Sequence, residues 1–228
     1  YPVGSVFASM HFQDKYEDKI DTSELDILVV SCWRGNIGFE QDVQDSMKAM
    51  RLFDLEFAAY LRKRNLKAAV ILRSERDSEH WFMPEMGVTE EEYFKSIYED
   101  NINIIETDFS LRNIYPLMAI SKLIIAGFGT TALLEAFGVG KKILYCDFTY
   151  QNKYFSDFNK EILFTDNKDS PALIFSDKLD ELLDISSHEY KKRYSSLMKF
   201  YQYCDENAPA QEMIRDKIIE ILNIDERH

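Results

Sequence analysis

The sequence predicts a doubly wound α/β domain with a mainly parallel central sheet, followed by a helical C-terminal extension. Between residues 26 and 147, short apolar runs rich in valine and isoleucine alternate with longer segments of helical periodicity. The apolar runs show no polar alternation, as expected for strands that are buried on both faces of a parallel sheet. Because a helical segment separates most neighbouring runs, the strands are expected to be linked by crossover helices.

The first half of this pattern has two strands and two helices. Residues 26–32 (DILVVSC) and 68–73 (AAVILR) are predicted strands. Between them, residues 41–63 carry apolar residues at three-, four- and seven-residue spacings, which predicts an amphipathic helix. Thr89 and Glu92 have the spacing of a capping box, so a second helix is expected to begin there.

The second half continues the alternation and ends in helices. Further strands are predicted at 102–106, 123–126 and 142–147, with helices at 115–120 and 130–137 and C-terminal helices at 178–183, 189–203 and 208–222. This pattern divides the chain into an N-terminal arm or interdomain connection (1–24), a Rossmann-like domain (25–200) and a helical extension (201–228).

Composition restricts the function classes. The chain has 228 residues, 46% of them hydrophobic, and a formal net charge of -13. A field of that sign argues against broad binding to nucleic acid or anionic membranes. Three widely spaced cysteines without a CxxC pair are expected to be reduced, and no uninterrupted apolar stretch predicts a membrane span. A cytoplasmic protein is therefore expected, and the first residue, Tyr1, favours an excised fragment.

The most informative segment is a glycine-rich turn between a predicted strand and a predicted helix. It reads Gly127-Phe128-Gly129-Thr130-Thr131. Glycines allow close backbone approach to a ligand, and the helix start offers N–H groups and the positive end of its dipole. Such a turn is typical of a phosphate site. The alternative is an ordinary strand-to-helix turn with a threonine cap.

The pattern AGFGTTALLEAFGVGKKIL resembles the donor-site segment of GT-B glycosyltransferases, and the similarity in element order extends over about residues 25–200. The resemblance implies that the turn, including Phe128, holds the donor diphosphate, and that Glu135 contacts the nucleotide ribose. Glu135 lies four residues after Thr131, so the two share a helix face. The alternative is a surface glutamate on an amphipathic helix. The overall sequence pattern resembles that of enzymes of bacterial surface-polysaccharide synthesis.

Three basic residues are candidates for contacts with the leaving diphosphate. Arg34 follows the first predicted strand and Arg73 ends the second, at the strand ends where open α/β sheets bind ligands. A fixed guanidinium would stabilise the charge that builds on a departing diphosphate. The resemblance also implies that Lys153, in the loop after the fifth strand, reaches the donor. The alternative for both arginines is an ordinary surface position.

A second function class uses the same turn. Gly127, Gly129 and Ala132 match the dinucleotide fingerprint G-x-G-x-x-A, and Asp147 ends the next strand, so an NAD(P)-dependent oxidoreductase is the main alternative. A nucleotide-sugar epimerase or a polyol-phosphate transferase of the same fold also remains open. No Walker A loop and no D-x-D pair occurs, so no metal and no cofactor is expected, with the nucleotide-sugar as co-substrate.

The resemblance implies the donor-binding domain of a larger glycosyltransferase that acts in surface-polysaccharide or glycoconjugate synthesis. The glycan or lipid-linked acceptor would bind through a missing N-terminal domain. Because GT-B catalysis takes place between two domains, this chain is expected to bind nucleotide-sugar without turnover. Any attachment to the inner membrane would be made by other parts of the parent protein.

Overall fold

A computed structural model describes residues 25–31, 40–78, 81–84, 86–108, 113–127, 130–147, 163–165, 171–200 and 210–222. Its centre is a six-stranded sheet with the order β5-β2-β1-β6-β7-β8, in which every pair of neighbours is parallel. The strands are β1 (Leu25–Val30), β2 (Ala68–Ile71), β5 (Asn103–Ile105), β6 (Ser121–Ala126), β7 (Lys142–Asp147) and β8 (Leu163–Thr165).

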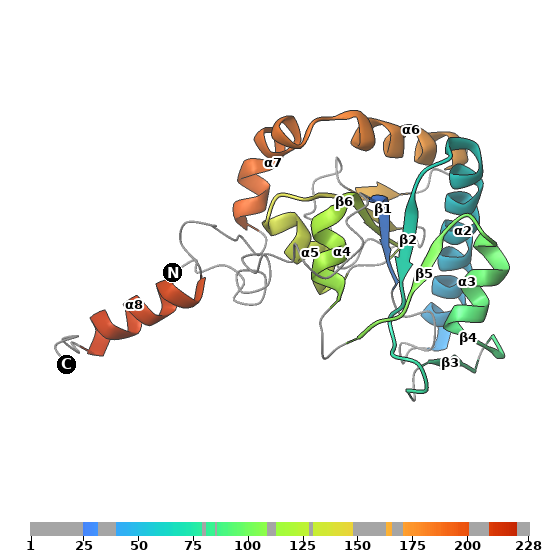
Figure 1. The fold of residues 1–228 in the computed structure, drawn as a ribbon, viewed down its shortest axis with the longest axis horizontal. Coiled ribbons are helices and arrows are strands. Elements are labelled where there is room, and N and C mark those ends of the chain that lie inside the picture. The colour runs from blue at the N-terminus through green and yellow to red at the C-terminus, as the bar shows by residue number, and fades with distance from the viewer. Residues whose placement is uncertain are drawn as a thin grey trace.

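Helices cover both faces of this sheet. Figure 1 shows α2 and α3 on one side of the sheet and α4 and α5 on the other, with α6 and α7 running across one end. The helices are α2 (Glu40–Arg64), α3 (Glu90–Tyr98), α4 (Ile114–Ile120), α5 (Thr131–Gly138), α6 (Pro171–Asp184), α7 (Ser187–Phe200) and α8 (Ala210–Leu222). The doubly wound, Rossmann-like fold predicted from the sequence is confirmed.

The central strands are buried on both faces. In β1, Ile27, Leu28 and Val29 are fully buried, and the neighbouring strands β2 and β6 are almost as enclosed. This burial explains why the strand sequences carry continuous apolar runs instead of an alternating pattern. The apolar strands form the hydrophobic core between the two helical layers.

A buried carboxylate joins α2 to α3. The side chain of Asp54 is fully buried and accepts hydrogen bonds from the hydroxyls of Tyr93 (2.7 Å) and Tyr98 (2.9 Å). Phe57, one turn along α2, packs edge-on against the Tyr98 ring. Because both hydroxyls are satisfied by one carboxylate, these tyrosines can lie in the core without unpaired donors.

The beginning of α3 follows the predicted capping box. The Thr89 hydroxyl accepts from the backbone N–H of Glu92 at 3.2 Å, and the Glu92 carboxylate accepts from the backbone N–H of Thr89 at 2.8 Å. These hydrogen bonds hold the pKa of Glu92 below its ordinary value, the backbone bond being the largest cause. Each of the two side chains therefore accepts the backbone N–H of the other residue, as the capping box predicts.

Two features were missed in the sequence. The sheet has a sixth strand, β8, and the segment before α3 forms a two-stranded antiparallel pair, β3 (Phe82–Met83) and β4 (Val88–Thr89). The predicted arm at 1–24 lies outside the described residues, as do Cys32 and Cys204, whereas Cys146 is buried and forms no disulfide. Of the helices that the structure describes, none combines the length and apolar character of a membrane span.

Candidate functional site

The strand order places a topological switch point at the carboxyl ends of β1 and β6. The chain builds the sheet outward from β1 to β2 and β5, and then crosses back to place β6 on the other side of β1. The helices that follow β1 and β6, α2 and α5, lie on opposite sides of the sheet (Figure 1). Ligands of open α/β sheets bind at such a switch point. Ser31 and Gly127 are the first residues beyond the two strands.

Helix α5 begins at Thr131, shortly after Gly127. Thr130 is the N-cap of α5, and its Oγ1 accepts a hydrogen bond from the backbone N–H of Leu133 at 3.1 Å. Thr131 begins the helix and its side chain is exposed. Phe128 and Gly129 lie outside the described residues. The structure thus places a capped helix N-terminus at the switch point, with the positive end of its dipole toward the carboxyl edge.

Gly127 is required by close packing against α2. A Cβ atom at this position would lie 2.6 Å from Cε of Met50 and 2.9 Å from Cδ1 of Phe53. The end of the methionine side chain can move, but the Phe53 ring is fully buried, stacked on Phe57 and edge-on to Phe175. Gly127 therefore lies directly against α2, and a side chain at this position would require the backbone or these two α2 side chains to shift.

The substitution Gly127→Val is expected to lower the free energy of unfolding by about 1–3 kcal/mol, because the added methyl groups overpack the site. Denaturant unfolding followed by circular dichroism measures this change. Thr131→Val is the control, since it places the same valine side chain at a nearby exposed position, where it exchanges only a hydroxyl for a methyl group, and it should change stability by less than about 0.5 kcal/mol. Equal effects of the two substitutions would contradict the packing argument.

Glu135 is buried rather than on the surface. Its side chain is 6% exposed, and its Oε2 accepts a hydrogen bond from the Tyr115 hydroxyl at 2.8 Å. Tyr115 lies in the first turn of α4 and Glu135 lies in the second turn of α5, so the pair joins two helices that begin near the carboxyl edge. Tyr115 was not predicted as a site residue, because nothing in the sequence links it to Glu135. A carboxylate has further lone pairs, so Tyr115 can orient Glu135 without saturating it.

Of the predicted cations, the structure describes one. Arg73 follows β2 at the carboxyl edge, where its side chain is half-buried and its backbone N–H donates to Oε2 of Glu90 at 3.0 Å. Arg34 and Lys153 lie outside the described residues. Glu90 and its second partner, Ser31, were not predicted as site residues. The sequence signal for Glu90 was a run of acids at a helix start, which gave no indication that one of them turns inward.

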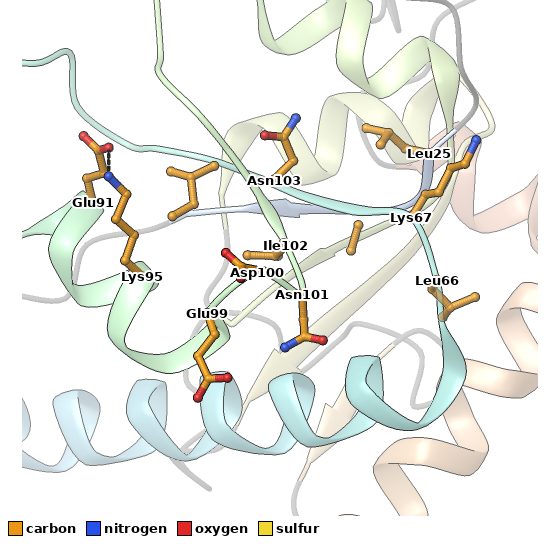
Figure 2. Close-up of a pocket in the computed structure, with 12 residues that line it drawn as sticks. Leu25, Leu66, Lys67, Glu91, Lys95, Glu99, Asp100, Asn101, Ile102 and Asn103 are labelled. Atoms are coloured by element: carbon orange, nitrogen blue, oxygen red, sulfur yellow. Dashed lines mark hydrogen bonds and ion pairs between the residues drawn. The ribbon is translucent and has the colours of Figure 1, made fainter.

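A separate groove lies at the opposite edge of the sheet. It has a volume of about 850 Å³ and is lined by the first residues of β1, β2 and β5 and by one side of α3. Figure 2 shows Lys95 of α3 paired with Glu91 beside this groove; their nitrogen and oxygen atoms are 2.5 Å apart. The groove adjoins the amino ends of the strands, so it is distinct from the switch point at Gly127. Within the described ranges, no group of three or more His, Cys, Asp or Glu side chains could hold a metal ion.

Comparisons with known proteins show likeness in structure only. No protein-family model and no curated protein matches the sequence. A Listeria monocytogenes protein assigned as a UDP-N-acetylglucosamine 2-epimerase superposes with a TM-score of 0.57 at 14% identity, covering 98% of this chain and 54% of that one. A UDP-N-acetylglucosamine 2-epimerase gives 0.53 at 13% identity, covering 99% and 53%. S. aureus MnaA in a co-structure with UDP gives 0.51 at 17% identity, covering 98% and 53%.

These similarities establish the fold. The chain has the Rossmann-like α/β architecture seen in one half of GT-B-like proteins, and it spans about half the length of the structures that it matches.

Proposed function

We propose that this chain binds the nucleoside diphosphate part of a nucleotide-sugar and forms one half of a two-domain GT-B-like enzyme. The observation that carries the proposal is the capped N-terminus of α5, which follows Gly127 at the switch point between β1 and β6. A helix N-terminus at the carboxyl edge of a doubly wound sheet is a favourable place for a diphosphate. The binding of UDP by S. aureus MnaA supports the same ligand class.

The proposed contacts follow from this placement. Backbone N–H groups of the turn, from Gly127 through Phe128 and Gly129, would hold the diphosphate together with the hydroxyls of Thr130 and Thr131. Glu135 would bind ribose hydroxyls, with Tyr115 holding one of its oxygens. The cations that would stabilise the leaving diphosphate are Arg34, Arg73 and Lys153.

The reaction that we propose for the parent enzyme is sugar transfer to a surface glycan or glycoconjugate. Charge builds on the leaving diphosphate as the sugar–phosphate bond breaks, and fixed cations and a helix N-terminus would lower that barrier. An acceptor would bind to the other half of the enzyme, so this chain alone would not turn over. Nucleotide-sugar epimerisation is the second candidate, and the likeness to two proteins named as UDP-N-acetylglucosamine 2-epimerases favours it.

A dinucleotide cofactor fits the geometry less well. The NAD fingerprint normally occupies the turn after the first strand of the fold. Here the turn after β1 begins Ser31-Cys-Trp-Arg-Gly, and the G-x-G-x-x-A match follows β6, the fourth strand of the parallel sheet along the chain. The glycine turn therefore supports a nucleoside diphosphate better than a dinucleotide.

Thermal-shift titration with UDP, CDP, CMP, GDP, ADP and NAD, first without metal and then with magnesium, tests this proposal. A ligand that binds only the folded state raises the melting temperature by mass action, so UDP or another nucleoside diphosphate is expected to stabilise the chain. A shift with NAD alone would favour an oxidoreductase instead. Absence of any shift, repeated by calorimetry at millimolar ligand, would contradict nucleotide binding by this chain.

A further inference from the structure

Glu90 is a buried carboxylate at the carboxyl edge of the sheet. It is the first residue of α3, its side chain is 2% exposed, and its backbone N–H donates to the carbonyl of Trp81 at 3.0 Å. An acidic residue at a helix start is ordinarily solvated and stabilises the helix dipole. Thr89 and Glu92 already form the capping box of α3, so the helix start does not require Glu90 to turn inward.

The two carboxylate oxygens of Glu90 bind the ends of two neighbouring strands. Oε1 accepts a hydrogen bond from the hydroxyl of Ser31, and Oε2 accepts one from the backbone N–H of Arg73 at 3.0 Å. Ser31 is the first residue after β1, and its own N–H donates to the carbonyl of Ile71, the last residue of β2, at 3.1 Å. Glu90 therefore continues the connection between β1 and β2 beyond the point where the backbone ladder ends.

We propose that Glu90 is a positioning residue for the proposed nucleotide site, which it serves by fixing the spacing and direction of the chain where β1 and β2 end. This inference rests on the proposed nucleotide site, because the switch point begins at Ser31 and the candidate cation Arg73 follows β2. A site whose strand ends are fixed in advance binds ligand at a smaller ordering cost.

The role is geometric and not electrostatic. A carboxylate near a diphosphate would oppose binding by its charge, so the presence of Glu90 beside the strand ends requires another reason. Glutamine has nearly the same shape and can keep both bonds: its carbonyl can accept from the N–H of Arg73, and its amide can donate to the Ser31 hydroxyl. Alanine loses both bonds. The pair Glu90→Gln and Glu90→Ala therefore separates geometry from charge.

Asp54 provides a matched control. It is also a buried carboxylate with two hydrogen-bond donors, and it also contacts α3, but its donors are the core tyrosines Tyr93 and Tyr98 and not the strand ends. Asp54→Ala should therefore lower stability while leaving the UDP affinity of the folded chain within about twofold of wild type. An effect of Glu90 that arises only from general destabilisation would appear equally in both variants.

The test measures UDP affinity by calorimetry under conditions in which each variant is folded. Glu90→Ala is expected to bind UDP about tenfold more weakly than wild type, and Glu90→Gln to remain within about twofold. Wild-type affinity in Glu90→Ala would overturn the proposal, and so would an equal loss in Glu90→Gln, because charge would then be responsible. If Glu90→Ala does not fold, Ser31→Ala removes one of the two bonds and is expected to weaken UDP binding about threefold.

Hydrogen exchange of the Arg73 amide tests the positioning without ligand. Exchange should become about tenfold faster in Glu90→Ala and remain near wild type in Glu90→Gln, since the N–H keeps an acceptor only in the second variant. Unchanged exchange in Glu90→Ala would overturn the inference even if UDP binds. If exchange changes as expected in the two variants but the wild-type chain binds no nucleotide, the positioning role would stand, and its link to ligand and the proposed function would be overturned.

Discussion

Replacement of Lys142 by methionine is expected to lower the free energy of unfolding by about 2–5 kcal/mol, because it leaves backbone carbonyls at the end of α6 without a donor. Lys142 is buried at the start of β7. Its Nζ donates to the carbonyls of Leu182 (2.7 Å), Leu183 (3.1 Å) and Ile185 (2.7 Å). Three acceptors match the three donors of an ammonium group. Methionine has a similar length and offers none.

The electrostatics of this lysine explain the size of the effect. Burial lowers the pKa of Lys142, while the carboxylate of Asp184 opposes that shift. The three carbonyls and the helix C-terminus offset part of the cost of burying the ammonium group. Removal of the charge leaves the carbonyls enclosed and unpaired, which costs more than the apolar side chain gains.

Guanidinium unfolding of Lys142→Met measures this loss, and the melting temperature should fall by roughly 2–4 °C per kcal/mol. Lys122→Met is the matched control. Lys122 lies in the neighbouring strand β6, but its ammonium is at the surface and bonds to the carboxylate of Asp26 at 2.9 Å. An exposed ion pair of this kind contributes about 0–1 kcal/mol. If both variants lost a similar free energy of unfolding, the hydrogen bonds from Lys142 to the end of α6 would not explain the loss.

The fold could be predicted because the local signals and the tertiary structure agree in the central strands and helices. The apolar runs at 26–32 and 123–126 became β1 and β6, as expected for short runs of this kind in strands buried on both faces. Strand β8, Leu163–Thr165, was missed because three residues show no periodicity. Helix α6 begins at Pro171, well before the predicted start at 178. The earlier start was missed because the first turns of the helix (PALIF) have an apolar sequence without a clear polar face.

The candidate site could be predicted only where local sequence defines it. Gly127 and Thr130 were identified because a turn and its helix cap are local features. The hydrogen bond between Tyr115 and Glu135 joins two helices, and Glu90 reaches residues on two strands, so neither contact leaves a pattern in the sequence. Long-range polar contacts depend on how the elements pack, which spacing alone does not reveal.

The substitution Glu135→Ala is expected to weaken UDP binding by about 1–3 kcal/mol, since charge-assisted hydrogen bonds to the ribose would be lost. Calorimetric titration of the folded variant measures this change. Glu135 also accepts the hydroxyl of buried Tyr115, so the substitution has a structural cost as well. Tyr115→Phe is the control for that cost, because it removes the same hydrogen bond and keeps the carboxylate.

The comparison of UDP with 2′-deoxy-UDP separates a ribose contact from an indirect effect. If Glu135 binds the 2′-hydroxyl, wild type should prefer UDP, and Glu135→Ala should lose that preference because it has no carboxylate to be left unpaired by the deoxy ligand. Tyr115→Phe should keep most of the preference, reduced only as far as the carboxylate becomes less well oriented. If Glu135→Ala weakened both ligands equally, the burial of Glu135 against Tyr115 would be sufficient to explain its presence, and the ribose would have to be bound by another group.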